Sequence, residues 1–132
     1  TWVLCDRFYD STRVYQGVAK QVGEAWLDQL HHLLFANTAP DLTLLLDVPP
    51  RVGLSRADRR GNVAESRFEQ MELSFHETLR TGFLRLAKAE PARIQVLDAS
   101  VDAATVHTHI VDAVNRRFSL ALAPVGQEVV HG

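Results

Sequence analysis

An aspartate followed directly by an arginine, Asp6-Arg7, ends the short apolar run with which the chain begins. A carboxylate can hold a metal ion that bridges phosphate groups, and a guanidinium can bind phosphate oxygens through parallel hydrogen bonds. Phosphoryl transfer uses both kinds of group, because both stabilise charge on the group in transfer. For an isolated pair the alternative is a surface salt bridge or a helix cap. The residues that follow favour the phosphate interpretation.

Aromatic rings and short hydrogen-bonding side chains come soon after this pair. They are Phe8, Ser11, Thr12, Tyr15 and Gln16. Rings stack on planar bases, and hydroxyl and amide groups can bond the edge of a base or a sugar. Each residue taken alone could simply pack or form a turn. Together with Asp6-Arg7 they indicate a site for a nucleotide.

A second charged group surrounds Gly61-Asn62. Its arginines are Arg51, Arg56, Arg59, Arg60 and Arg67, interleaved with Asp58, Glu65 and Glu69. Arginines on a hinged segment could close over phosphates as a lid. The alternative is a pair of solvated helices with ion pairs at helical spacing. The glycine break favours a lid, which we place at about residues 56–67.

Other polar residues carry weaker signals. Asp47 ends an apolar run, as in the acidic strand of nucleotide hydrolases, but it precedes Val48-Pro49-Pro50, and we favour a helix cap. The six histidines lack a metal-binding spacing such as His-Glu-x-x-His. Ser11 lies in no nucleophile elbow. We therefore expect neither a zinc site nor Ser-His-Asp chemistry.

Apolar runs and helical periodicities position these residues. Continuous apolar runs predict buried parallel strands at 2–5, 42–46 and 94–97. Apolar side chains three and four residues apart predict helices at about 23–35, 50–59, 68–89 and 106–118, before a loose tail at 119–132. Strands that alternate with helices predict an α/β fold with a parallel sheet between helical layers. Asp6-Arg7 would then lie at the carboxyl edge of the sheet, where such folds bind ligands.

Composition narrows the class of protein. The 132 residues are 46% hydrophobic and 23% charged with a net charge of −2, which predicts one soluble globular domain or part of one. This charge argues against duplex nucleic acid or an anionic membrane as the main partner. No apolar run approaches the roughly 20 residues of a membrane-spanning helix. The single cysteine, Cys5, allows no intrachain disulfide and fits the cytoplasm.

Three blocks of the sequence resemble bacterial thymidylate kinases in type, order and spacing. They are residues 2–17, 40–56 and 66–70, and the resemblance extends from Thr1 to about Phe118. It implies a P-loop NTPase-like three-layer fold and a single, incomplete nucleoside monophosphate kinase domain over 1–132. It also implies phosphoryl transfer from ATP to dTMP with Mg²⁺, giving dTDP and ADP, in a cytoplasmic homodimer.

The resemblance also implies roles for the residues of the first block. Asp6 would face the magnesium ion, and Arg7 would bridge the acceptor phosphate and the phosphoryl group in transfer. Ser11 and Thr12 match positions near the thymine edge, with Phe8 and Gln16 completing the substrate site. Tyr15 matches the aromatic residue that crowds the sugar and disfavours a ribose hydroxyl.

Two later segments match the ATP side of the family. Arg60 matches a catalytic lid arginine, while Arg56, Arg59 and Arg67 are further lid or phosphate-binding positions. The turn Asp98-Ala99-Ser100 resembles the loop beside the adenine, with contacts through its backbone.

The sequence departs from the family at its beginning. The phosphate-binding loop Gly-x-x-x-x-Gly-Lys-Ser/Thr does not occur, so we expect these residues alone to be a weak or inactive kinase. We expect one or two further strands before Thr1. Two alternatives stay open: a kinase for another nucleoside monophosphate, or a non-catalytic fragment that keeps the fold and binds through the helix with Trp26, Leu30 and Leu34.

Overall fold

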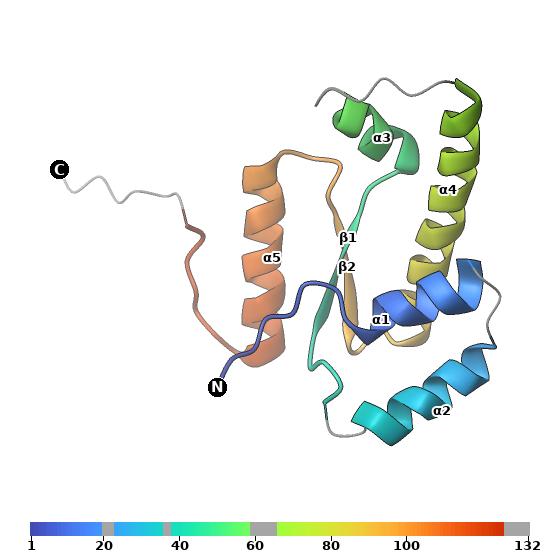
Figure 1. Cartoon of the computed structure of the whole chain (residues 1–132). Coiled ribbons are helices and arrows are strands. Elements are labelled where there is room, and N and C mark those ends of the chain that lie inside the picture. Colours follow the sequence, from blue (N-terminus) through green and yellow to red (C-terminus); the bar gives the residue numbers. More distant parts are fainter. Residues whose placement is uncertain (20–22, 36–37, 59–65, 126–132) are drawn as a thin grey trace.

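The computed structural model describes residues 1–19, 23–35, 38–58 and 66–125, and Figure 1 shows their arrangement. In chain order the elements are α1 (Tyr9–Thr12), the π-helix η1 (Arg13–Ala19), α2 (Glu24–Phe35), β1 (Thr43–Asp47), α3 (Pro50–Asp58), α4 (Ser66–Ala89), β2 (Ile94–Asp98) and α5 (Ala103–Phe118). The two strands run parallel and pair from Thr43 with Ile94 to Asp47 with Asp98. The predicted α/β class is confirmed.

Helices cover both faces of this sheet. Figure 1 shows α4 on one side and α5 on the other, and both helices contact β2. Ile94 and Leu97 point to opposite faces because they lie three residues apart on a strand, yet both are buried. Burial on both faces explains why β2 reads as a nearly continuous apolar run. The other buried apolar residues of the layers are Leu79 and Ala87 of α4 and Val111 and Ala113 of α5.

The predicted strand at residues 2–5 is wrong. This segment has no regular secondary structure, and Leu4 is 100% exposed. Trp2 packs edge-on against Phe118 of α5, with the ring centroids 4.9 Å apart. An apolar run becomes a strand only when a neighbour offers backbone hydrogen bonds. Within the described residues, only β1 and β2 pair with each other.

Hydrogen bonds to α5 hold part of the segment that follows this helix. Asp102 caps the start of α5, its Oδ1 accepting from the Thr105 N–H at 2.9 Å, and Ser119 ends the helix in the left-handed conformation. Residues 119–125 belong to the expected loose tail. The Leu122 N–H donates to Oδ1 of Asn115 at 2.9 Å, and the Val125 N–H donates to Nε2 of His107 at 3.0 Å.

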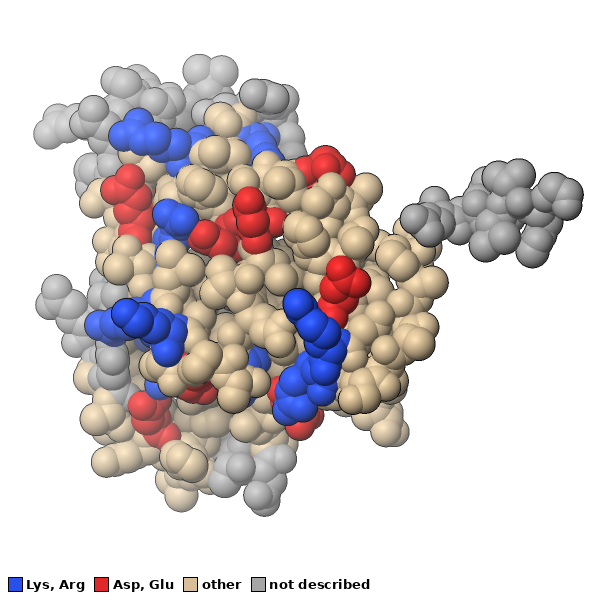
Figure 2. All heavy atoms as spheres, turned by 180° about the vertical axis from the view of Figure 1, so that it is seen from behind, with Lys and Arg blue, Asp and Glu red and all other residues tan. Residues whose placement is uncertain are grey.

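The molecular surface mixes both signs of charge. Figure 2 shows lysine and arginine side chains interspersed with acidic ones on the face opposite to that of Figure 1. Of the helices in the described ranges, none combines the length and the apolar character needed to cross a membrane.

Candidate functional site

Arg7, Ser11 and Tyr15 come together beside α4, and we call these three residues the acceptor cluster. The guanidinium carbon Cζ of Arg7 lies 4.7 Å from the ring centroid of Tyr15, a cation–π distance. Its Nε lies 3.4 Å from Oγ of Ser11, which is long for a hydrogen bond. Edge-on contacts from Phe75 and Phe83 of α4, at centroid distances of 6.3 and 6.4 Å, fix the Tyr15 ring.

The backbone of Arg7 is strained. Its φ of 61° lies in the left-handed region, which a side chain with a Cβ rarely adopts. Such strain costs on the order of 1–3 kcal/mol and clusters at functional sites. The conformation turns the chain sharply between the apolar start and α1, and it leaves the Arg7 side chain exposed.

The remaining predicted residues of the first block lie before, between and after the members of this cluster in the sequence. Asp6 is exposed in the bend before α1, and the Phe8 ring meets the ring of Tyr9 edge-on at 6.5 Å. Thr12 is exposed at the end of α1, whereas Gln16 is half-buried in η1. A site for a nucleotide at this surface would therefore be open to solvent.

The relation of this block to the sheet differs from the prediction in one respect. Because residues 2–5 form no strand, Asp6-Arg7 does not follow directly on a strand of the sheet. The helix α1 that follows is instead held at the amino edge, where Asp10 contacts Thr43, the first residue of β1.

The lid residues are described only in part. Arg56 lies on α3, and its Nη1 donates to the carbonyl of Ala99 at 3.0 Å and its Nη2 to that of Ser100 at 2.5 Å. Arg59 and Arg60 lie outside the described residues. Arg67 belongs to the first turn of α4, but its side chain is also outside the described part.

The turn after β2 borders an open hollow of about 480 Å³. The N–H and hydroxyl of Ser100 both donate to Oδ1 of Asp98, at 2.8 and 2.6 Å, and these bonds hold the pKa of Asp98 below its ordinary value. A hollow of this volume has room for a small-molecule group. Its lining residues are Arg56, Ala99, Val101, Asp102, Ala103, Val106, His107 and Ile110.

Asp47 does not cap α3. The carbonyl of Pro49 receives the first helical N–H groups, from Val52 and Gly53, so Pro49 holds the capping position. The Asp47 carboxylate instead accepts a fork of hydrogen bonds from Arg80 of α4, at 2.7 and 2.8 Å. This hydrogen-bonded pairing raises the pKa of Arg80 and fastens α4 to the carboxyl end of β1.

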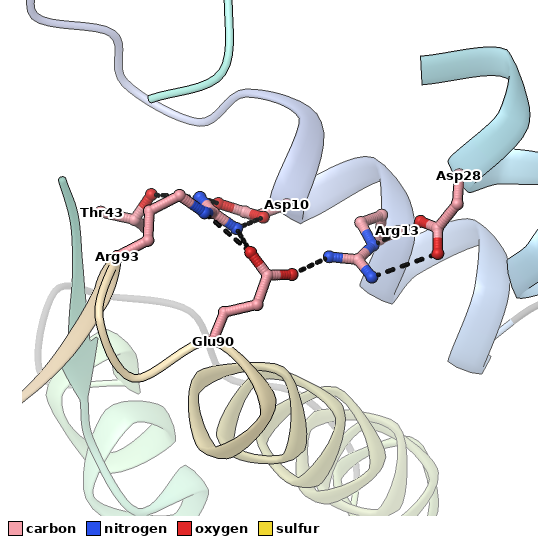
Figure 3. A network of polar contacts seen from close by, with 6 residues as sticks. All are labelled: Asp10, Arg13, Asp28, Thr43, Glu90 and Arg93. Atoms are coloured by element: carbon pink, nitrogen blue, oxygen red, sulfur yellow. Dashed lines mark hydrogen bonds and ion pairs between the residues drawn. The ribbon is translucent and has the colours of Figure 1, made fainter. Parts of the chain in front are cut away.

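A network of ion pairs, shown in Figure 3, anchors α1 at the opposite edge. Arg93 Nη2 donates to Oδ1 of Asp10 at 2.8 Å, and Nη1 donates to Oδ2 at 2.7 Å. The Thr43 hydroxyl donates to Oδ2 of Asp10 at 3.1 Å and accepts from Arg93 at 2.9 Å. Asp10 is only 8% exposed, so this carboxylate depends on these partners for the solvation it has lost.

The network continues from Arg93 to α2. Glu90, just after α4, accepts from Arg93 Nε at 2.8 Å and from Arg13 Nη1 at 2.6 Å, and Arg13 Nε lies 2.8 Å from Asp28. Burial alone would raise the pKa of Glu90, but the two arginines outweigh burial and lower it. The hydrogen bonds that Arg93 donates to Asp10 similarly raise the pKa of Arg93. Charges of alternating sign thus tie α1, η1 and α2 to the amino edge of the sheet.

This network was not predicted from the sequence. Asp10 lies inside the first block, but 83 residues separate it from Arg93, and no spacing links them. One usable signal in the sequence is the apolar residue Val14, four positions after Asp10, because residues at this spacing share one face of a helix. In the structure Val14 is 2% exposed, so this face points inward.

The described residues contain no group of three or more His, Cys, Asp or Glu side chains that could hold a metal ion. Mg²⁺ often takes only one or two carboxylates, with waters and substrate phosphates as its other ligands. The exposed Asp6 carboxylate fits that mode of binding.

Comparison with known proteins connects the chain to one family. The family profile described as "Thymidylate kinase" matches residues 1–110. A thymidylate kinase of Afipia carboxidovorans is 50% identical over 122 residues, 92% of this chain and 54% of its relative; one of Bradyrhizobium sp. (strain ORS 278) is 45% identical, covering 93% and 55%. The crystal structure of thymidylate kinase from Ehrlichia chaffeensis superimposes with a TM-score of 0.58 at 27% identity, over 83% of this chain and 46% of that one. The chain spans about half the length of the curated relatives it matches.

Proposed function

Because the chain belongs to the thymidylate kinase family, we propose that it supplies the acceptor site and the lid for phosphoryl transfer from ATP to dTMP, giving dTDP and ADP. One observation carries the proposal: a strained, exposed arginine lies over the ring of Tyr15 with the Ser11 hydroxyl beside it. This arrangement offers a cation for phosphate and an aromatic wall with a hydroxyl for the rest of a nucleotide.

Arg7 acts on the phosphates. A charged phosphate oxygen is a stronger acceptor than the neutral Ser11 hydroxyl at 3.4 Å, so a bound acceptor draws the guanidinium away from its present contacts. The planar fork then spans the acceptor phosphate and the phosphoryl group and stabilises their charge. Asp6 would hold Mg²⁺, and the bound ion would supply positive charge to the phosphoryl oxygens.

The other predicted residues complete the two substrate sites. Phe8, Ser11, Thr12, Tyr15 and Gln16 bind dTMP, with Tyr15 against the sugar. The hollow beside Ala99 takes the adenine of ATP, and Arg56, Arg59, Arg60 and Arg67 close over the phosphates, Arg60 being the catalytic lid arginine. The contact of Arg56 with the carbonyls of Ala99 and Ser100 supports a link between the lid and the adenine side.

We place the protein in the cytoplasm as a homodimer. Trp26, Leu33 and Leu34 of α2 are 58%, 82% and 60% exposed and share one side of the helix. Large apolar side chains grouped in this way favour burial against a partner.

The test is dTMP-dependent formation of ADP from ATP and Mg²⁺. It is run on the 132-residue chain and on the full product of its reading frame, with dCMP and dGMP as competing acceptors. Arg7→Ala should lower kcat by about a hundredfold or more, the loss typical of one preorganised charge-stabilising group. Arg116→Ala, which removes an exposed arginine of α5, is the matched control.

Each outcome is informative. Preference for dTMP supports the thymidylate site, and preference for another acceptor would assign a different nucleoside monophosphate kinase. Turnover unchanged in a folded Arg7→Ala variant would remove Arg7 from the mechanism. No ADP formation with any of these acceptors, from either product, would leave the non-catalytic fragment as the correct interpretation.

A further inference from the structure

We infer that Asp10 and Arg93 are positioning residues for the acceptor cluster. The inference rests on the function proposed above, because the geometry they control is that of Arg7, Ser11 and Tyr15. Neither residue belongs to the acceptor cluster. They act through the backbone of α1 and η1, which carries Ser11 and Tyr15 and begins two residues after Arg7.

Asp10 lies on the same continuous stretch of backbone as the acceptor cluster. Asp10 follows Arg7 by three residues and precedes Ser11 directly, and α1 passes into η1, which carries Tyr15, without a break. A shift of α1 at Asp10 therefore moves the strained turn at Arg7, the Ser11 hydroxyl and the Tyr15 ring together.

The helix α1 cannot hold its position by itself. It has four residues, far fewer than the roughly 12–15 that an isolated helix needs for marginal stability. Tertiary contacts must fix it, and the two-pronged bond between Asp10 and Arg93 is the best-defined of those described. Parallel bonds to both carboxylate oxygens restrain the angle of α1 as well as its distance.

Arg93 is itself held by neighbours other than Asp10. Its guanidinium also bonds Glu90 and Thr43, so it is fixed to the end of α4 and the first residue of β1 before it meets Asp10. Because Phe75 and Phe83 of α4 hold the Tyr15 ring, Arg93 sets α1 against the same helix that forms the wall of the acceptor cluster. An error of about 1 Å in such a site can cost about a hundredfold in rate.

The experiment uses the full product of the reading frame in the ADP assay above. Arg93→Lys keeps the charge but loses the fork, Asp10→Asn keeps the shape but loses the charge, and Thr43→Val removes only the bridging hydroxyl. Val111→Ala, which truncates a buried residue of α5 away from the network, is the control for lost stability. Thermal midpoints, kcat, and KM for dTMP and for ATP are measured at a temperature where each variant is folded.

We expect Arg93→Lys and Asp10→Asn to lower kcat/KM for dTMP by about tenfold to a hundredfold while KM for ATP changes less than about twofold. Thr43→Val should have a smaller effect of the same kind. Val111→Ala should lower the thermal midpoint and leave the kinetic constants within about twofold.

A purely structural network gives a different pattern. If the variants lose thermal stability but keep kcat/KM for dTMP, or if KM for ATP rises in parallel, the inference is overturned. If Arg93→Lys and Asp10→Asn do not fold, an unchanged kcat/KM for dTMP in Thr43→Val is sufficient to overturn the inference. If the unaltered product phosphorylates no dTMP, the proposed function itself has failed, which separates that failure from one confined to this network.

Discussion

Removing the Arg93 side chain tests the energetics of the buried ion network. In Arg93→Met the Asp10 carboxylate keeps, among its side-chain bonds to described residues, the Thr43 hydroxyl bond at 3.1 Å, and its side chain is 11% exposed in the unaltered protein. Breaking a buried pair by removing one partner costs about 3–5 kcal/mol, because the other charge is left uncompensated. The remaining exposure and the Thr43 bond reduce this penalty, so we expect a loss of about 3 kcal/mol in the free energy of unfolding.

The double variant Asp10→Leu/Arg93→Met separates charge burial from packing. Replacing both partners of a buried pair by apolar groups is often close to neutral, so the double variant should be more stable than Arg93→Met alone. Urea unfolding followed by circular dichroism gives the four free energies of this cycle. A cost below about 1 kcal/mol for Arg93→Met would refute the assignment of Asp10 as a desolvated charge, and so would an uncoupled double variant.

Three further predictions follow from other contacts. Tyr15→Ala should relax the preference for dTMP over its ribose counterpart, as the ratio of the two kcat/KM values measures; an unaltered ratio contradicts the role of Tyr15. Glu90 has a lowered pKa when folded, so it stabilises the fold above its ordinary value of 4.5 and loses that effect as the pH falls through the folded pKa. Glu90→Gln should therefore lower stability at pH 7 by more than at acid pH, and equal losses in urea titrations at both pH values would exclude this linkage. Leu33→Lys on α2 should shift a dimer toward monomer in sedimentation, and an unchanged mass would exclude that face as the interface.

Sequence patterns predict those helices and strands in which the apolar residues follow a regular local pattern. The strands β1 and β2 and the helices α2 to α5 were all predicted within a few residues, because each carries an apolar pattern of period two or 3.6, or a continuous apolar run. Residues 2–5 show the limit of this approach. Their apolar character is that of a strand, but strand formation depends on a neighbour that local sequence does not reveal.

The site residues also divide into those that a local sequence pattern groups and those that only the fold brings together. The grouping of Arg7, Ser11 and Tyr15 follows from one short segment, so spacing and resemblance could suggest it. Asp10 and Arg93 meet only because β1, β2 and the end of α4 bring them together, and the left-handed turn at Arg7 leaves no trace in residue type. Long-range ion pairs and backbone strain are properties of the assembled fold.

The parallel sheet of β1 and β2 has a consequence for handling the protein. In the described ranges each strand pairs on one side only, so two rows of backbone N–H and C=O groups face outward. Leu46 and Val96 are 48% and 45% exposed on these strands, and edges with apolar neighbours recruit strands from other molecules. The 132-residue chain should therefore form intermolecular β-structure at high concentration. A further strand docked beside β1 or β2 would suppress that association.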